Sequence, residues 1–120
     1  MRRLAACCML LTLAATLSRA FDIDDINGNW RARDFAGMGF HFNVDDDDEI
    51  TGTWVFRNGE KECPITRSRI LSQNRFEVEF TCEDRPNQPW KFVGGIVNQG
   101  QVINLEAWDH RFGYVLLRAR

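Results

Sequence analysis

The sequence has 120 residues with 15 basic and 17 acidic side chains, which gives a formal net charge of −2. This length suits one small domain and excludes two. The chain has no basic stripe that could neutralise a phosphate backbone, so its composition argues against a nucleic-acid partner.

The first twenty residues are typical of a cleaved secretory signal peptide. Two arginines precede an apolar run from Leu4 to Leu17, and small residues stand at Ser18 and Ala20, the positions that a signal peptidase reads. Cleavage after Ala20 leaves residues 21–120 as a single domain. Loss of the three leader arginines takes the 15 basic residues to 12 against 17 acidic ones, a net charge of −5. We therefore expect a secreted protein, either extracellular or periplasmic.

Other interpretations of this leader stay open. The apolar run is shorter than the ~20 residues of a membrane-spanning helix, which argues against a permanent anchor. A mitochondrial presequence would need spaced arginines and serines, which the leucine-rich centre lacks. The segment Leu4 to Cys7 resembles a lipoprotein box, but most of the apolar core follows Cys7 instead of preceding it.

Two cysteines, Cys63 and Cys82, remain in the predicted mature chain. An even pair in an exported protein predicts a disulfide bond. A loop of about 20 residues closed in this way stabilises the fold by about 3 kcal/mol. The alternative is a pair of buried free thiols.

The segment from Phe21 to Ile26 alternates apolar and acidic residues and is predicted to lie across one end of the sheet as a turn or short helical plug. Its acids do not match an EF-hand calcium loop, which needs a ligand where Ile26 stands and a glycine one place before Gly28. We interpret these acids as solvated.

Eight short runs with a period of two follow this segment and predict β-strands. They span residues 28–33, 38–44, 49–56, 62–69, 76–82, 90–96, 102–107 and 113–118. The last run is apolar on both faces, so we expect this strand to be covered on both sides and the protein to associate with itself through it.

The turns between these runs have recognisable chemistry. Asn58-Gly59 predicts a type I′ hairpin, since both residues tolerate a positive φ, and residues 98–100 predict another turn. Pro64 cannot donate a hydrogen bond and predicts an edge position or a bulge. The acidic hairpin tip at Asp45 to Glu49 would attract a cation or a basic partner, or it acts only as a solubilising turn.

Eight strands with short connections predict an all-β fold, an antiparallel up-and-down barrel. An open sheet would leave two edges exposed, and closure of the sheet removes them. No internal repeat and no helix of three turns is evident in the sequence.

The triplet Gly28-Asn29-Trp30 resembles the opening of the first strand in the calycin superfamily of lipocalins and avidins. The resemblance implies that Arg118, late in the last strand, packs over Trp30, and that Gly28 is structural. A biotin site is not implied, because Ala32 and Ala36 stand where an avidin would place polar ligands. The secreted bacterial metalloprotease inhibitors are another family of small barrels with a similar size and opening.

No residue pattern indicates catalysis or a metal site. His41 lies on the polar face of a predicted strand and His110 in a turn, and neither has a serine or cysteine nucleophile at motif spacing. The ligand spacings of structural or catalytic zinc are also missing. We therefore expect a protein that is not an enzyme and holds no cofactor.

Aromatic residues are the most informative feature, with four tryptophans, nine phenylalanines and one tyrosine. They either fill the barrel or surround one small ligand. In the second case the expected lining residues are Phe42, Trp54, Phe80, Trp90 and Trp108. The leading hypothesis is a secreted, non-enzymatic protein that takes up a small apolar or aromatic ligand at the open end of the barrel. The second is a protein-binding module, such as a protease inhibitor or effector, acting through Phe21 to Asn27 or through rim loops.

Overall fold

The computed structural model describes residues 22–119. It contains eight strands, each formed by one of the alternating runs. They are β1 (Gly28–Ala32), β2 (Gly39–Val44), β3 (Ile50–Phe56), β4 (Lys61–Ser72), β5 (Arg75–Phe80), β6 (Trp90–Val97), β7 (Val102–Ala107) and β8 (Gly113–Arg118). Each strand pairs antiparallel with its neighbours in sequence, and β1 also pairs with β8. The sheet is therefore a closed up-and-down barrel, as predicted. The predicted signal peptide 1–20, the alternatives for it and Phe21 lie outside the described residues.

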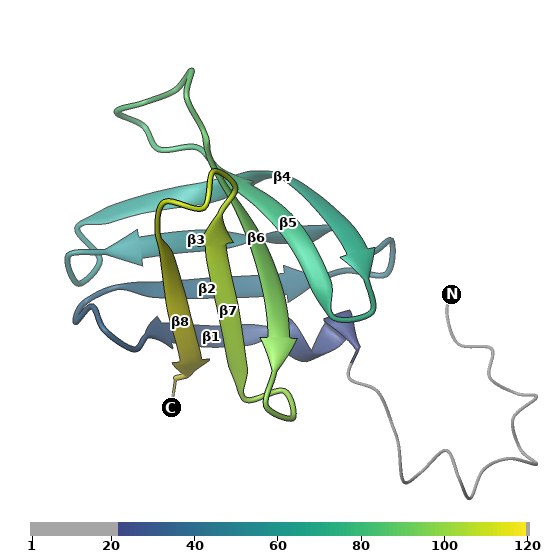
Figure 1. Cartoon of the computed structure of the whole chain (residues 1–120). Helices are drawn as coiled ribbons and strands as arrows, with labels where there is room; N and C mark the ends of the chain where they lie inside the picture. The colour runs from purple at the N-terminus through teal and green to yellow at the C-terminus, as the bar shows by residue number, and fades with distance from the viewer. Residues whose placement is uncertain (1–21, 120) are drawn as a thin grey trace, which may run out of the picture.

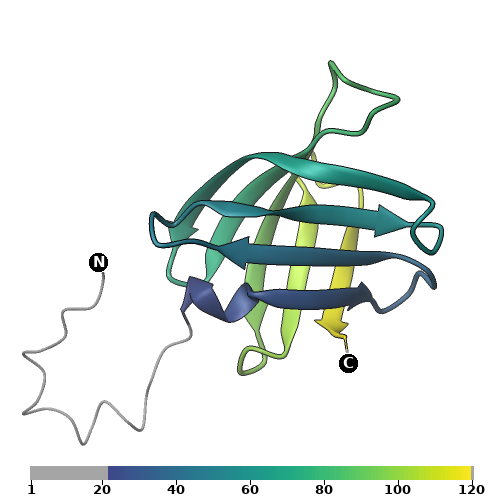
Figure 2. The ribbon, with the colours of Figure 1, turned by 180° about the vertical axis from the view of Figure 1, so that it is seen from behind.

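The barrel has two halves whose strands cross steeply (Figure 1). Strands β1 to β4 lie side by side in one half, and β5 to β8 lie side by side in the other, which the view from behind also shows (Figure 2). In both views the β5–β6 loop, residues 81–89, stands away from the barrel wall.

Strand β4 is longer than predicted, because two irregularities in its pairing with β5 let it bend around the barrel without ending. The register shifts between Ile65 and Arg67, directly after Pro64, as expected for a bulge near this proline. The β3–β4 ladder ends at the pair Thr53 and Pro64. Beyond it, the backbone N–H of Ile50 donates to Ser68 Oγ at 3.0 Å, so a side chain replaces the missing ladder bond.

Two predicted turns are confirmed by their backbone. In the β3–β4 hairpin, Asn58 and Gly59 have φ values of 54° and 93°, and the N–H of Glu60 donates to the carbonyl of Arg57 at 3.2 Å. These are the φ signs of a type I′ turn. The turn at residues 98–101 has the same form, with positive φ at Gln99 and Gly100.

Cys63 and Cys82 form the predicted disulfide, with their Cα atoms 4.4 Å apart. The pairing of Ile65 with Phe80, two residues inside each cysteine, places the cysteines opposite each other. Both side chains are buried, so the bond fastens β4 to the end of β5 from within the barrel.

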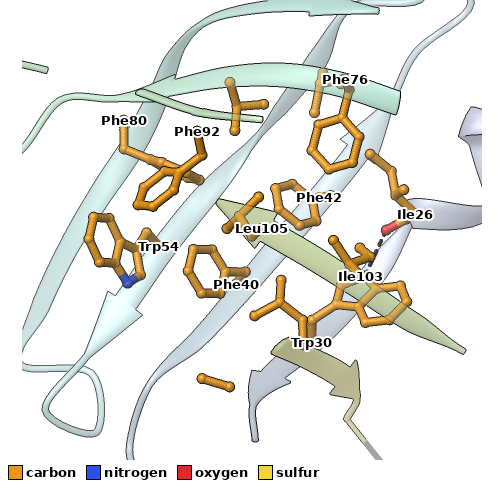
Figure 3. Close-up of a cluster of buried hydrophobic side chains, with 14 of the residues drawn as sticks. Ile26, Trp30, Phe40, Phe42, Trp54, Phe76, Phe80, Phe92, Ile103 and Leu105 are labelled. Carbon is orange, nitrogen blue, oxygen red and sulfur yellow. Dashed lines mark hydrogen bonds between the residues drawn. The ribbon is translucent and has the colours of Figure 1, made fainter. Parts of the chain in front are cut away.

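One end of the barrel is sealed by a short 3₁₀ helix, η2 (Ile23–Ile26), which confirms the predicted plug for its described part. Asp22 caps this helix, and Ile26 is fully buried. The indole Nε1 of Trp30 donates to the carbonyl of Ile26 at 2.8 Å, the bond drawn in Figure 3. The seal is thus tied directly to β1.

Candidate functional site

The two ends of the barrel differ in how they are covered. In an up-and-down barrel, alternate loops gather at the same end, so the loops that precede β3, β5 and β7 lie with η2 at the sealed end. The loops at residues 33–38, 57–60, 81–89 and 108–112 lie at the opposite end, called the open end below. Among the described residues, no helix covers the open end.

A continuous set of aromatic rings, called the aromatic cluster, runs from the barrel interior to the open end. It consists of Phe35, Phe40, Trp54, Phe56, Phe80, Trp90, Phe92, Phe112 and Tyr114. Neighbouring ring centres are 5.0 to 6.1 Å apart, and most pairs meet edge to face, the favourable arrangement for aromatic side chains. Phe80 and Phe92 are fully buried, whereas Phe35 and Phe112 at the rim are 47% and 37% exposed.

Trp54 contacts aromatic rings on β2, β5, β6 and β8. Figure 3 shows it next to Phe80 and Phe92. Its ring stacks on Phe40 with an interplanar angle of 9° and centres 5.6 Å apart. The side chain is 5% exposed, and its indole Nε1 has no hydrogen-bond partner among the described residues. Within residues 22–119, it is the only buried side-chain nitrogen or oxygen atom without a hydrogen-bond partner.

Two cations lie over rings near the open end. The guanidinium of Arg85, in the β5–β6 loop, lies 4.2 Å from the centre of the Trp90 ring. The ammonium of Lys61, at the start of β4, lies 5.6 Å from the centre of Phe56 and also pairs with Asp84. Both contacts are cation–π interactions, so these cations stabilise the positions of the two rings.

Tyr114 brings a hydroxyl group into the aromatic cluster. Its ring contacts Phe35, Trp54 and Phe112 at 5.2, 6.0 and 5.8 Å between centres. Burial raises the pKa of the Tyr114 phenol, because the charged form would lose its hydration. The hydroxyl is therefore protonated at neutral pH.

Of the five residues predicted to line a ligand, the structure places three in the aromatic cluster, one directly beneath it and one outside it. Trp54, Phe80 and Trp90 belong to the aromatic cluster. Phe42 lies deeper, fully buried between Phe40 and Phe76. Trp108 lies in the β7–β8 turn, is 62% exposed, and is outside the cluster.

The predicted ligand residues did not include six members of the aromatic cluster: Phe35, Phe40, Phe56, Phe92, Phe112 and Tyr114. A signal for them was present. Loops that leave odd-numbered strands of a meander all meet at one end, and Phe35 and Phe112 lie in two such loops. Counting the predicted strands would have placed Phe35 and Phe112 at the same end of the barrel.

The two histidines have local partners on the surface. His41 Nδ1 lies 2.7 Å from Asn29 Oδ1, and His110 Nδ1 lies 3.0 Å from Glu106 Oε2. In the acidic tip, Asp45 Oδ1 accepts hydrogen bonds from the N–H groups of Asp47 and Glu49, so this carboxylate stabilises the turn. Residues 22–119 contain no cluster of histidine, cysteine and acidic side chains that could hold a metal ion.

The described surface hollows lie on the outer faces of the barrel and, in one case, at the open end beside Glu60, Glu83 and Asp84. The largest described has a volume of about 520 Å³ and lies across β1, β2 and β3, with Arg31, His41, Val55 and Asn58 in its lining. None of the hollows described is lined by any of the five predicted ligand residues. In the deep half of the barrel the aromatic side chains pack against one another instead.

Comparison with protein-family models, with curated proteins and with solved structures gave no match in any of the three. The fold and the aromatic cluster define an eight-stranded, closed, antiparallel barrel with an aromatic open end. This architecture is compatible with the calycin superfamily. Arg118 lies over Trp30, as that resemblance implies. Within residues 22–119, no helix is both long and apolar enough to cross a membrane.

Proposed function

We propose that this is a non-enzymatic binding protein that takes up a small apolar or aromatic ligand at the open end of its barrel. The supporting observation is the gradient of exposure along the aromatic cluster. Phe92 is fully buried, and Phe35, at the rim, is 47% exposed, whereas Ile26 at the sealed end is fully buried. Exposed rings that continue into a buried aromatic surface offer a ligand both access and contact area.

The rim rings are the point of access. Phe35 and Phe112 both pack against Tyr114 from loops, and not from strands. A ligand that packed against these two rings at the rim would cover the apolar surface that they now expose to water.

Tryptophan fluorescence tests this proposal. Titration with naphthalene should quench the signal of Trp54 and Trp90 and reach saturation. Phe35→Ala and Phe112→Ala should each weaken binding by about fivefold, the loss of one ring contact. Leu71→Ala is the matched control, because Leu71 is 38% exposed and lies on β4 toward the sealed end. A titration without saturation, or equal effects of all three variants, would contradict the proposal.

A protein partner at the rim is the second candidate, and Trp108 is the observation that favours it. Its 62% exposure is unusual for a tryptophan, and exposed tryptophans are enriched at the centres of protein interfaces. The N-terminal segment is a weaker route, since Ile23 and Ile26 are buried against the barrel. Trp108→Ala should abolish a complex isolated from the native fluid and leave naphthalene affinity unchanged.

We also propose export to an oxidising compartment and self-association. The disulfide favours export, since such bonds persist outside the reducing cytosol. Mass spectrometry of the exported protein should find a chain that begins at Phe21. For self-association, Val97, Val102 and Leu117 form an apolar row across the outer faces of β6, β7 and β8. Sedimentation should detect a dimer that Leu117→Lys dissociates, and monomer alone at high concentration would contradict it.

A further inference from the structure

We infer that the ligand is a planar aromatic molecule with a neutral hydrogen-bond acceptor, and that this acceptor bonds the Nε1–H of Trp54. The inference rests on the proposed function and specifies its ligand. It starts from the difference between the two most buried indoles. Trp30, 1% exposed, donates from Nε1 to the Ile26 carbonyl at 2.8 Å, whereas Trp54 Nε1 has no partner among the described residues.

An unpaired buried donor is costly, and folded proteins satisfy nearly all of them. The remainder of this barrel follows that rule, because no polar or charged residue among those described is fully buried. Trp54 Nε1 is therefore the exception in an otherwise satisfied interior. An indole N–H that has no acceptor and is surrounded by aromatic rings is suited to bind a ligand that carries a hydrogen-bond acceptor.

The rings around Trp54 decide the shape of the ligand. Phe40 stacks parallel to the indole, whereas Phe92 and Trp90 meet it edge-on, with interplanar angles of 86° and 88°. Parallel and perpendicular ring walls accept a flat ring system by stacking and edge contacts, and they fit a flexible acyl chain less well. In Figure 3 the nitrogen lies on the edge of the indole turned away from Phe80 and Phe92.

The charge of the ligand follows from the same surroundings. Among the cations at this end, Arg85 and Lys61 lie over the rim rings Trp90 and Phe56, and Lys61 is paired with Asp84. Arg33 and Arg111 lie in loops and are paired with the adjacent acids Asp34 and Asp109. An anionic group beside Trp54 would lose its hydration without a facing cation. A carbonyl or ether oxygen, which is neutral, accepts the N–H bond without that loss.

The test compares indane with indanone, two flat molecules that share a ring skeleton and differ by one carbonyl oxygen. In the unmodified protein, indanone should bind about tenfold more tightly, the usual size of one hydrogen bond. It should also shift the indole N–H resonance of Trp54 in the nuclear magnetic resonance spectrum. Neither measurement needs a variant, so a folding defect cannot hide the result.

Variants then locate the effect. Trp54→Phe should remove the preference for indanone and keep the affinity for indane, and the matched control Trp90→Phe should keep the preference. Equal affinity for the two molecules, or a shift confined to another tryptophan, would overturn the inference and leave the proposed function standing if naphthalene binds. Failure of indane, indanone and naphthalene alike would overturn both.

Discussion

The guanidinium carbon of Arg118 lies 4.3 Å from the centre of the Trp30 ring. The two residues are directly paired between β8 and β1, so their contact lies at the point where the barrel closes. Arg118 also donates to the carbonyls of Asn27 and Gly100, each at 3.1 Å, and to that of Asp25. One side chain thus joins the first strand, the last strand, the helix η2 and a turn at the sealed end.

Arg118→Ala should lower the free energy of unfolding by about 2–4 kcal/mol, because it removes a cation–π contact and several charge-assisted hydrogen bonds. Arg118→Lys should recover only a small part, since an ammonium group lacks the planar fork that reaches several carbonyls. Urea unfolding measures both. The control Arg69→Ala removes an exposed ion pair with Glu77 and should change little. Equal losses in the two alanine variants would contradict this role.

Reduction of the Cys63–Cys82 disulfide should destabilise the protein by about 3 kcal/mol, because the unfolded chain regains the freedom of a loop whose ends are 19 residues apart. Urea unfolding with and without dithiothreitol measures the difference. The double variant Cys63→Ala/Cys82→Ala should be destabilised too, and its unfolding should no longer respond to the reductant. A response to dithiothreitol in that variant would mean that the reductant acts elsewhere.

Gly94→Ala should cost about 1–3 kcal/mol through overpacking. A methyl group at this position would stand 2.8 Å from two ring carbons of Phe76, its partner across the β5–β6 ladder. Phe76→Leu should relieve the clash, so the double variant should lose less stability than the two single losses combined. Gly95→Ala is the matched control, since its methyl group would lie 3.8 Å from the nearest atom, and it should not destabilise the protein.

The stability of the protein should fall as the pH rises above 10, partly because of Tyr114. Burial raises the pKa of this phenol above its ordinary value of 10.0, so the folded state favours the protonated form. Below that pH the phenol is protonated in both states and stability is complete. Above it, the unfolded chain releases the proton first, and the balance moves toward unfolding.

Two measurements check this pH dependence. Tyr114 is the single tyrosine of the sequence, so phenolate absorbance follows it alone. Its midpoint should be higher in the folded protein than in urea, and Tyr114→Phe should lose less stability at high pH. Identical midpoints in the two states would show that the ring is more hydrated than its contacts indicate.

Much of the fold could be predicted because its causes are local. Alternation in residues 38–44 places Phe40 and Phe42 on one face whatever surrounds them, and the Asn58-Gly59 pair favours a tight hairpin by its tolerance of positive φ. The end of β4 was harder. The sequence after residue 69 lacks clear alternation. The strand continues to Ser72 because irregularities in its pairing with β5 shift the register and let the ladder go on.

The candidate site was only partly predictable. Trp54, Phe80 and Trp90 could be placed on inward faces from their own strands, but Trp108 has the same apolar character and lies in an exposed turn. The type of a side chain predicts its preference for burial. It does not predict whether the fold places that side chain in the interior.

The eight strands other than the end of β4, their order, the turns and the disulfide could be predicted, since each depends on residues close in the chain or on a single pair. The degree of burial of each ring, and the lack of a hydrogen-bond partner at Trp54 Nε1, could be known only from the folded barrel. Both depend on closure of the sheet, which brings β8 against β1 and surrounds Trp54 with rings from distant strands. No local pattern encodes that neighbourhood, because it is created by contacts between residues far apart in the chain.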